Sequence, residues 1–239
     1  MQATGSQNMY LAKRTEYFGT PRMDIAPLLP GEPGQPLGRV LEIGCGSGAT
    51  MAWLRTQRPV TLAVGVELTE GNAAVARAAF DEVIAGSIEA PAVVDSLPTF
   101  DLILALDVLE HLVDPAAVVR RLATRLAPGG AFVVSLPHVG HYSVALPLVL
   151  KGRWTYQDEG LLDRTHLRFF DRVSAPALLT ENGLTIERLE PVIDTGGLFN
   201  VVLFRSSRRL RWYTTRLLQH VLPGNMLEYR FLIRGRVPG

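Results

Sequence analysis

The residues with the clearest chemical potential lie in one stretch near the start of the chain, R-V-L-E-I-G-C-G-S-G over residues 39–48. Its apolar part predicts a buried strand, and the alternating glycines predict a sharp turn into a helix over residues 49–55. Because glycine lacks a Cβ, a ligand can approach the turn closely, and the helix start offers N–H groups and a partial positive charge. The stretch therefore predicts a site for a nucleotide or a nucleotide-like cofactor.

Glu42 separates two interpretations of this turn. Gly44, Gly46 and Ala49 fit the G-x-G-x-x-A variant of the dinucleotide fingerprint, and Glu67 follows near the distance expected for a ribose contact. A carboxylate beside the turn would, however, repel the pyrophosphate of a dinucleotide. It suits S-adenosylmethionine, which carries a sulfonium and an ammonium but no phosphate, and whose own carboxylate can meet the helix N-terminus.

V-L-E-I-G-C-G-S-G resembles the first motif of class I S-adenosylmethionine-dependent methyltransferases, in particular the group that includes ubiquinone-biosynthesis methyltransferases. F-D-L-I-L-A-L-D-V-L-E-H over residues 100–111 resembles their fourth motif. L-A-P-G-G-A-F-V-V-S-L-P over residues 126–137 resembles the turn that opens their fifth strand. The resemblance implies an α/β fold with a Rossmann-like, doubly wound, seven-stranded sheet. Its last strand is antiparallel and lies between the fifth and sixth, and a lid insertion follows strand 5.

The resemblance also implies cofactor contacts at the carboxyl ends of the strands. Glu67 would accept hydrogen bonds from the ribose diol. Ser87 stands where the family usually has an acidic residue that binds the adenine amino group, so it would bind that group more weakly, and Ile88 could pack on the adenine. Asp107 would lie beside the methionine moiety, and His111 could orient the cofactor or simply end a helix. The predicted cofactor-binding residues are Tyr17, Glu42, Gly44, Cys45, Gly46, Gly48, Glu67, Leu68, Ser87, Ile88, Leu106, Asp107 and His111.

Histidines that follow the fifth strand are the candidates for catalysis. Residues 137–172 contain His138, His141 and His166, and we expect this segment to form a substrate lid. His166 is the first choice for a general base because the ordinary pKa of histidine lies near neutrality, with His138 and His141 next. Alternatively, Asp163, Arg164 and His166 form a structural network that anchors the lid. These histidines lack the tight spacing of a metal site, so no metal is predicted.

The ends of the chain have separate roles in this interpretation. Residues 1–36 form an N-terminal cap segment, and Tyr17 either folds over the cofactor or packs on the domain edge. Residues 37–239 form the methyltransferase domain, which ends in a basic helix and the last strand over residues 205–239. A basic amphipathic helix near residues 205–222 would either pack on its own domain or contact a membrane surface or a lipid-linked substrate.

The overall composition narrows the possible partners and the cellular setting of the protein further. A net charge of +1 gives no general field for nucleic acid, so no nucleic-acid partner is predicted. The single cysteine, Cys45, excludes an internal disulfide and fits a reducing, cytoplasmic setting. No signal peptide or apolar run of spanning length is visible.

The sequence therefore predicts a methyltransferase that uses S-adenosylmethionine and methylates an oxygen or nitrogen of a small-molecule acceptor. The acceptor would be a sugar, glycan precursor, quinone or natural product. G-L-L-D-R-T-H-L-R-F-F over residues 160–170 resembles a stretch of bacterial methyltransferases associated with cell-surface glycan or natural-product pathways. Two other classes stay open: an NAD(P)-dependent oxidoreductase on a Rossmann fold, and a non-catalytic S-adenosylmethionine-binding partner protein. The sequence does not fix the oligomeric state.

Overall fold

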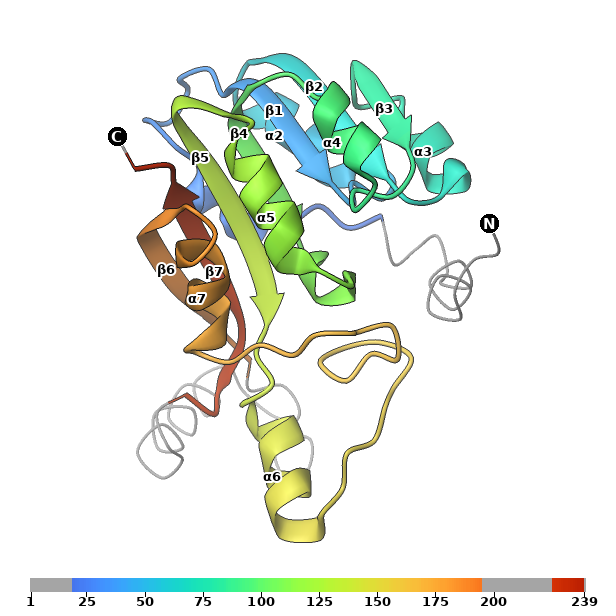
Figure 1. Ribbon diagram of the computed structural model, residues 1–239, viewed down its shortest axis with the longest axis vertical. Helices are drawn as coiled ribbons and strands as arrows, with labels where there is room; N and C mark the ends of the chain where they lie inside the picture. Colours follow the sequence, from blue (N-terminus) through green and yellow to red (C-terminus); the bar gives the residue numbers. More distant parts are fainter. Residues whose placement is uncertain (1–18, 195–224, 239) are drawn as a thin grey trace, which may run out of the picture.

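The computed structural model describes residues 19–194 and 225–238, which form a seven-stranded sheet between helices (Figure 1). The strand order is β3-β2-β1-β4-β5-β7-β6. The strands are β1 (Gly38–Ile43), β2 (Val60–Glu67), β3 (Glu82–Ala85), β4 (Phe100–Leu106), β5 (Leu126–Pro137), β6 (Thr185–Ile193) and β7 (Glu228–Arg236). The predicted α/β class and strand number are confirmed.

Strand directions also agree with the prediction. β1 to β5 run parallel to one another, whereas β7 is antiparallel to both β5 and β6, between which it lies. The chain order reverses on either side of β1, where β2 lies on one side and β4 on the other. In open α/β sheets, ligands bind outside the carboxyl ends of the strands at such a reversal. That edge carries most of the predicted site residues.

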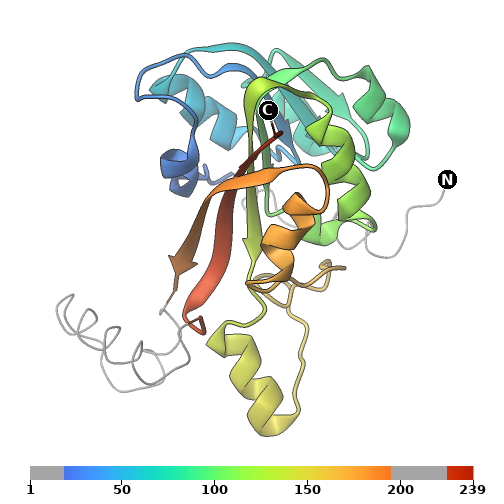
Figure 2. The same ribbon diagram turned by 60° about the vertical axis from the view of Figure 1, so that its left-hand side comes forward.

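Helices cover both faces of the sheet (Figures 1 and 2). They are the 3₁₀ helices η2 (Met23–Leu28) and η3 (Leu109–His111), together with α2 (Ala49–Gln57), α3 (Glu70–Ala76), α4 (Pro91–Ser96), α5 (Pro115–Ala123), α6 (Tyr142–Lys151) and α7 (Ser174–Thr180). Two separate apolar cores follow from this arrangement. α4, α5 and α7 pack on one face, while η2, α2 and α3 pack on the other.

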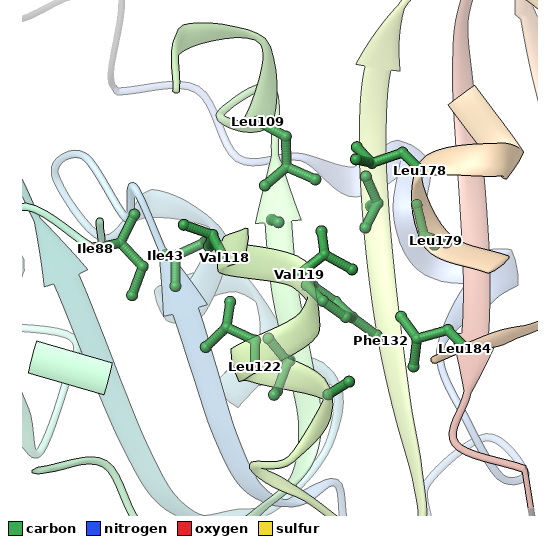
Figure 3. Packing of buried hydrophobic residues seen from close by; sticks show 14 of the residues in the cluster. Ile43, Ile88, Leu109, Val118, Val119, Leu122, Phe132, Leu178, Leu179 and Leu184 are labelled. Carbon is green, nitrogen blue, oxygen red and sulfur yellow. The ribbon is translucent and has the colours of Figure 1, made fainter. Parts of the chain in front are cut away.

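The larger core shows how α5 is held to the sheet (Figure 3). Val118, Val119 and Leu122 are at most 3% exposed, and they share one face of the helix because their spacing matches the helical repeat. Phe132, on β5, is fully buried in the same cluster. Burial of each such side chain contributes about 1.5–3 kcal/mol. This packing fixes the loop between β4 and α5, which carries several site residues.

Local sequence signals explain most helix starts. Thr69 accepts a hydrogen bond from the Asn72 N–H at the start of α3, and Asp114 accepts one from the Ala117 N–H at the start of α5. At the start of α7, Ser174 is the first helical residue rather than the cap. Asp171 accepts from the N–H groups of residues 173 and 174 instead, since its carboxylate lies one turn earlier.

α6 was not expected, and it extends beyond the end of the sheet, away from the main layers (Figures 1 and 2). Pro147 lies inside this helix, where proline usually interrupts the hydrogen-bond ladder. Among the residues described, no helix is long and apolar enough to cross a membrane. Tyr17 and the predicted helix of residues 205–222 lie outside the described residues.

Candidate functional site

The glycine turn joins β1 to α2 in a conformation that few other residues adopt. Gly44 has a φ of +62°, and Gly48, the N-cap of α2, has a φ of +83°. A Cβ on Gly44 would lie 2.4 Å from a methyl carbon of Val108. The absence of a side chain at Gly44 therefore lets the segment after β4 approach the turn. This close approach forms one wall of the site.

Three neighbouring cavities open at the carboxyl ends of the strands. The β3-side cavity is lined by Gly44, Val66, Glu67, Leu68, Gly86, Ser87, Ile88, Glu89, Asp107, Val108, His111, Leu112, Val113, Thr165 and Leu167. The glycine-turn cavity is lined by Thr20, Arg22, Glu42, Gly44, Cys45, Gly46, Ala49, Thr50, Leu106, Asp107, Val108, His111 and Arg230. The β7-side cavity, of about 430 Å³, is lined by Asp107, Glu110, Pro137, Gln157, Glu159, Gly160, Leu161, His166, Tyr229 and Arg230. Asp107 borders all three, so the cavities adjoin one another around this residue.

Nearly all the predicted cofactor-binding residues border this region. Only Gly48 among those described lies outside the cavity walls, where it starts α2 instead. The β3-side and glycine-turn cavities meet at Gly44, Asp107, Val108 and His111. Two joined cavities of this kind match an elongated ligand that lies across the ends of β1, β2 and β4.

Glu67 ends β2 and is 1% exposed. Its Oε2 accepts a hydrogen bond from the Gly46 N–H at 3.1 Å, and its Oε1 accepts from the N–H and hydroxyl of Thr69 at 3.1 and 3.2 Å. Glu67 thus ties the glycine turn to the start of α3. Oε2 keeps more acceptor capacity than Oε1 toward a ligand hydroxyl in the β3-side cavity.

Ser87 and Ile88 lie farther along the same cavity, after β3. The Ser87 hydroxyl accepts a hydrogen bond from the Glu89 N–H at 3.2 Å, and the hydroxyl can still donate or accept a bond to a ligand. Ile88 is 6% exposed and belongs to the core cluster under α5. Together they give this end of the cavity one polar and one apolar wall, as a purine ring requires.

Glu42 supplies a buried carboxylate beside the glycine turn. It is 4% exposed, and its Oε2 has no hydrogen-bond partner among the described residues. Burial raises the pKa of Glu42 to about 8, although the charge of Arg22 opposes this shift. A cationic ligand group would satisfy the unpaired oxygen and favour the ionised form. The ammonium and sulfonium of S-adenosylmethionine supply such groups, so the residues present fit the predicted cofactor.

Cys45, in the turn itself, is buried, and its Sγ lies next to Gly65. Burial and the neighbouring carboxylates of Glu42 and Glu67 raise the pKa of the Cys45 thiol. The thiol therefore stays protonated at neutral pH and is a poor nucleophile. Its position next to the turn is that of a small packing residue.

Asp107 is the centre of an ion-pair network that joins distant parts of the chain. Its carboxylate lies 2.6 Å from Arg22 Nη1 and 3.0 Å from Arg230 Nη1, and it also accepts a hydrogen bond from the Ser135 hydroxyl. Burial works against the charged form, but the two arginines outweigh it and lower the pKa of Asp107. Asp107 also has a φ of +54°, which is uncommon outside glycine and typical of functional positions.

Three residues of the site, Arg22, Arg230 and Glu110, are not predicted by the sequence. Arg22 is 85 residues from Asp107 in sequence, and Arg230 is 123 residues away, so no local spacing could connect them. Glu110 stands beside His111 in the V-L-E-H segment, which was the only available signal. In each case the fold, rather than a local sequence pattern, brings the residue to the site.

His166 lies in the wall of the β7-side cavity and is 7% exposed. Its Nδ1 is 3.2 Å from the Leu161 carbonyl oxygen, and its Nε2 is 3.9 Å from Glu110 Oε1. Since a carbonyl only accepts hydrogen bonds, the first contact favours a proton on Nδ1 and leaves Nε2 as the basic nitrogen. Burial and the nearby charge of Asp107 raise the pKa of Glu110 well above its ordinary value, which favours its neutral form.

Glu110 and His166, together with His111, bring metal-ligating atoms close to one another. One ligand atom each from Glu110, His111 and His166 lies within 4.8 Å of the others, so this cluster could hold a divalent cation. Of the three histidines in residues 137–172, which the sequence suggests as possible metal ligands, only His166 belongs to this cluster. Glu110 and His111 come instead from η3.

His138 and His141 do not reach the three cavities. The buried His138 ring contacts the Glu228 carbonyl oxygen at 2.9 Å, and this contact joins β5 to the start of β7. His141 caps α6 through its contact with Ser143, and its other ring nitrogen is 3.1 Å from the Asp194 carbonyl oxygen. Burial lowers the pKa of His141. The structure gives both histidines a structural environment, so His166 is left as the catalytic candidate.

Comparison with known proteins was made on the whole chain. A family model described as a methyltransferase domain matches residues 10–189. The ubiquinone biosynthesis O-methyltransferase of Bradyrhizobium diazoefficiens is 35% identical over 114 residues, which cover 46% of this chain and 44% of that protein. The enzyme of the same name from Dinoroseobacter shibae is 32% identical over 168 residues, which cover 68% of this chain and 64% of that protein. The similarity thus covers less than two thirds of the length of either relative.

A solved structure supports the fold. The S-adenosylmethionine-dependent methyltransferase of Archaeoglobus fulgidus superposes with a TM-score of 0.62 over 96% of this chain and 97% of that one. The two sequences are 15% identical, so this likeness concerns the fold alone.

Proposed function

Because the chain belongs to the class I S-adenosylmethionine-dependent methyltransferases, we propose that it methylates a hydroxyl oxygen of a small-molecule acceptor, with His166 as general base. The observation that carries this proposal is the position of His166 in the wall of the β7-side cavity, which adjoins the cofactor region at Asp107. The names of the relatives describe O-methyltransferases, which supports an oxygen acceptor.

The cofactor would occupy the glycine-turn and β3-side cavities. Glu42 would pair with the methionine ammonium, Glu67 would accept a hydrogen bond from the ribose, and Ser87 and Ile88 would contact the adenine. When bound, S-adenosylmethionine supplies an electrophilic methyl group. Asp107 and its arginine partners stand between the cofactor and the acceptor cavity, so their main role is to keep the two ligands aligned.

His166 would remove the acceptor proton during attack. The contact of Nδ1 with the Leu161 carbonyl supports a proton on Nδ1, which would leave Nε2, 3.9 Å from Glu110 Oε1, to accept the proton. The proton taken from the hydroxyl would remain on Nε2 near Glu110, and the positive imidazolium would then favour ionisation of that carboxyl group. Alcohols require such a base because they are weak nucleophiles when protonated.

The segments around the cavity also have proposed roles. Residues 137–172 would form the wall and lid over the acceptor, since Gln157, Glu159 and Leu161 border the β7-side cavity. The N-terminal segment, residues 1–36, would cap the methionine end, because Arg22 reaches Asp107 from it. A cavity of about 430 Å³ suits a small acceptor such as a sugar, a quinone precursor or another natural product.

Methyl transfer from radiolabelled S-adenosylmethionine to matched alcohol and amine acceptors tests the proposal. We expect label on hydroxyl compounds. His166→Ala should lower kcat by about 10²–10⁴-fold, leave the affinity for S-adenosylhomocysteine unchanged, and remove the loss of rate at acidic pH. Arg164→Ala is the matched control, because Arg164 lies in the same segment but pairs with Asp158 outside the cavity. Label on amines alone, or a full rate in His166→Ala, would contradict the proposal.

A further inference from the structure

The last turn of α6 carries a cluster of exposed aliphatic side chains. Val149 is 79% exposed, Leu150 is 72% exposed and Leu148 is 43% exposed. Elsewhere in the described part of the chain, large exposed apolar residues occur singly along the sequence, which is normal for a protein surface. Within residues 19–194 and 225–238, nothing packs over these three consecutive aliphatic residues to account for them.

The position of the cluster is as unusual as its composition. α6 extends away from the sheet and its helices in both views, with the last turn at the far end of the projection (Figures 1 and 2). The base of the helix is anchored, because Val144 is 4% exposed and packs with Leu161 and Leu162. The helix is therefore fixed at one end and presents aliphatic side chains to the surroundings at the other.

Positive charge surrounds this tip. Lys151 and Arg153 follow the aliphatic cluster directly and are exposed. Between them, Gly152 ends the helix with a φ of +60°. No acidic residue occurs from position 142 to position 157. Aliphatic side chains next to cations complement a bilayer surface that combines acyl chains with anionic headgroups.

We propose that the tip of α6, residues 148–153, docks this protein on an anionic phospholipid bilayer. The aliphatic residues would enter the boundary between headgroups and acyl chains, and Lys151 and Arg153 would contact lipid phosphates. Docking would also bring the acceptor cavity close to the membrane, because Leu161 belongs both to the cluster that anchors α6 and to the cavity wall. This proposal does not depend on the identity of the acceptor.

Co-sedimentation of the full chain with lipid vesicles tests the proposal. Wild-type protein should bind vesicles of phosphatidylcholine mixed with phosphatidylglycerol more tightly than vesicles of phosphatidylcholine alone. Val149→Ser/Leu150→Ser should weaken binding by about 10-fold or more, because two aliphatic side chains no longer enter the bilayer. Lys151→Gln/Arg153→Gln should weaken binding to the anionic vesicles by about fivefold per cation, and added salt should reduce this difference.

Val75→Ser/Val173→Ser is the matched control, since both valines are more than half exposed but lie on α3 and before α7. It should bind vesicles as the wild type does. Unchanged S-adenosylhomocysteine affinity shows that each variant is folded. The proposal is overturned if the wild type does not bind vesicles, or if Val149→Ser/Leu150→Ser binds them equally well. It is also overturned if light scattering shows that this substitution converts a dimer into a monomer, because the tip would then contact a second copy.

Discussion

Replacement of Glu67 by glutamine tests how the site holds the ribose of its cofactor. Glu67 is almost completely buried at the end of β2, in the wall of the β3-side cavity. Glutamine has nearly the same shape but no charge, and only one of its two terminal atoms accepts hydrogen bonds. We therefore expect Glu67→Gln to weaken cofactor binding without a large change in packing.

The expected loss follows from the contacts of the two carboxylate oxygens. Oε1 already accepts from the N–H and hydroxyl of Thr69, whereas Oε2 accepts only from the Gly46 N–H. One direct bond from Oε2 to a ribose hydroxyl is therefore expected. A hydrogen bond to a charged group contributes about 1.5–3 kcal/mol, which corresponds to a loss of roughly 10- to 150-fold in affinity.

Isothermal titration calorimetry with S-adenosylhomocysteine measures this loss directly. Glu70→Gln is the matched control, since Glu70 is three residues away, exposed, and paired only with Arg77. It should bind as the wild type does. A 2′-deoxy or 3′-deoxy ligand should lose affinity for the wild type but little more for Glu67→Gln, because the same bond has already been removed. Glu67→Gln affinity within threefold of the wild type would refute this role for Glu67.

Two further substitutions test the glycine turn. Gly44→Ala should destabilise the fold by about 1–3 kcal/mol in urea unfolding, because of its positive φ and the contact with Val108, and Gly44→Ala/Val108→Ala should recover only the part due to that contact. Wild-type stability in Gly44→Ala would contradict the geometry of the turn. Because the pKa of Glu42 is raised from 4.5 to about 8, the unfolded chain releases this proton at lower pH than the folded one, so the Glu42 contribution to stability should fall as pH rises from about 4.5 to 8. Glu42→Gln should lose this part of the pH dependence in urea titrations, and an unchanged pH profile would show that the carboxylate is not buried as described.

Individual strands and helix starts could be predicted from the sequence because their signals are local, whereas the arrangement of the sheet was implied by the family resemblance. The apolar run that ends at Leu106 predicts a strand buried on both faces, and the caps at Thr69 and Asp114 mark helix starts within a few residues. The antiparallel last strand came from family resemblance rather than from any local pattern. β7 indeed pairs with β5 over seven residue pairs, from Ala131↔Arg236 to Pro137↔Arg230.

α6 was missed because its stability comes from tertiary contacts. Pro147 removes one backbone donor from the helix and predicts an interruption. The anchoring contacts of Val144 with Leu161 and Leu162 join segments that are separate in sequence. Local helix propensity does not include this packing energy, so the apolar run that contains Pro147 does not predict a helix.

Only the part of the candidate site at the carboxyl ends of the strands could be predicted from the sequence. Residues that end strands, such as Glu42, Glu67 and Asp107, follow from the sheet pattern. Arg22 and Arg230 reach Asp107 only because η2 and β7 pack near the same edge, and no spacing along the chain records that contact. His138 and His141 follow β5 directly, yet carbonyl oxygens of Glu228 and Asp194 engage their rings.

The most direct test of the account is equilibrium binding of radiolabelled S-adenosylmethionine to the full chain, with competition by S-adenosylhomocysteine and, separately, by oxidised and reduced nicotinamide dinucleotides. We predict one site per chain, displacement by S-adenosylhomocysteine, and no displacement by either dinucleotide, because the ammonium of the S-adenosyl ligands satisfies the unpaired Glu42 oxygen beside the glycine turn and a dinucleotide has no such group. Absence of binding, or displacement by a nicotinamide dinucleotide at comparable concentration, would contradict the assignment of this site.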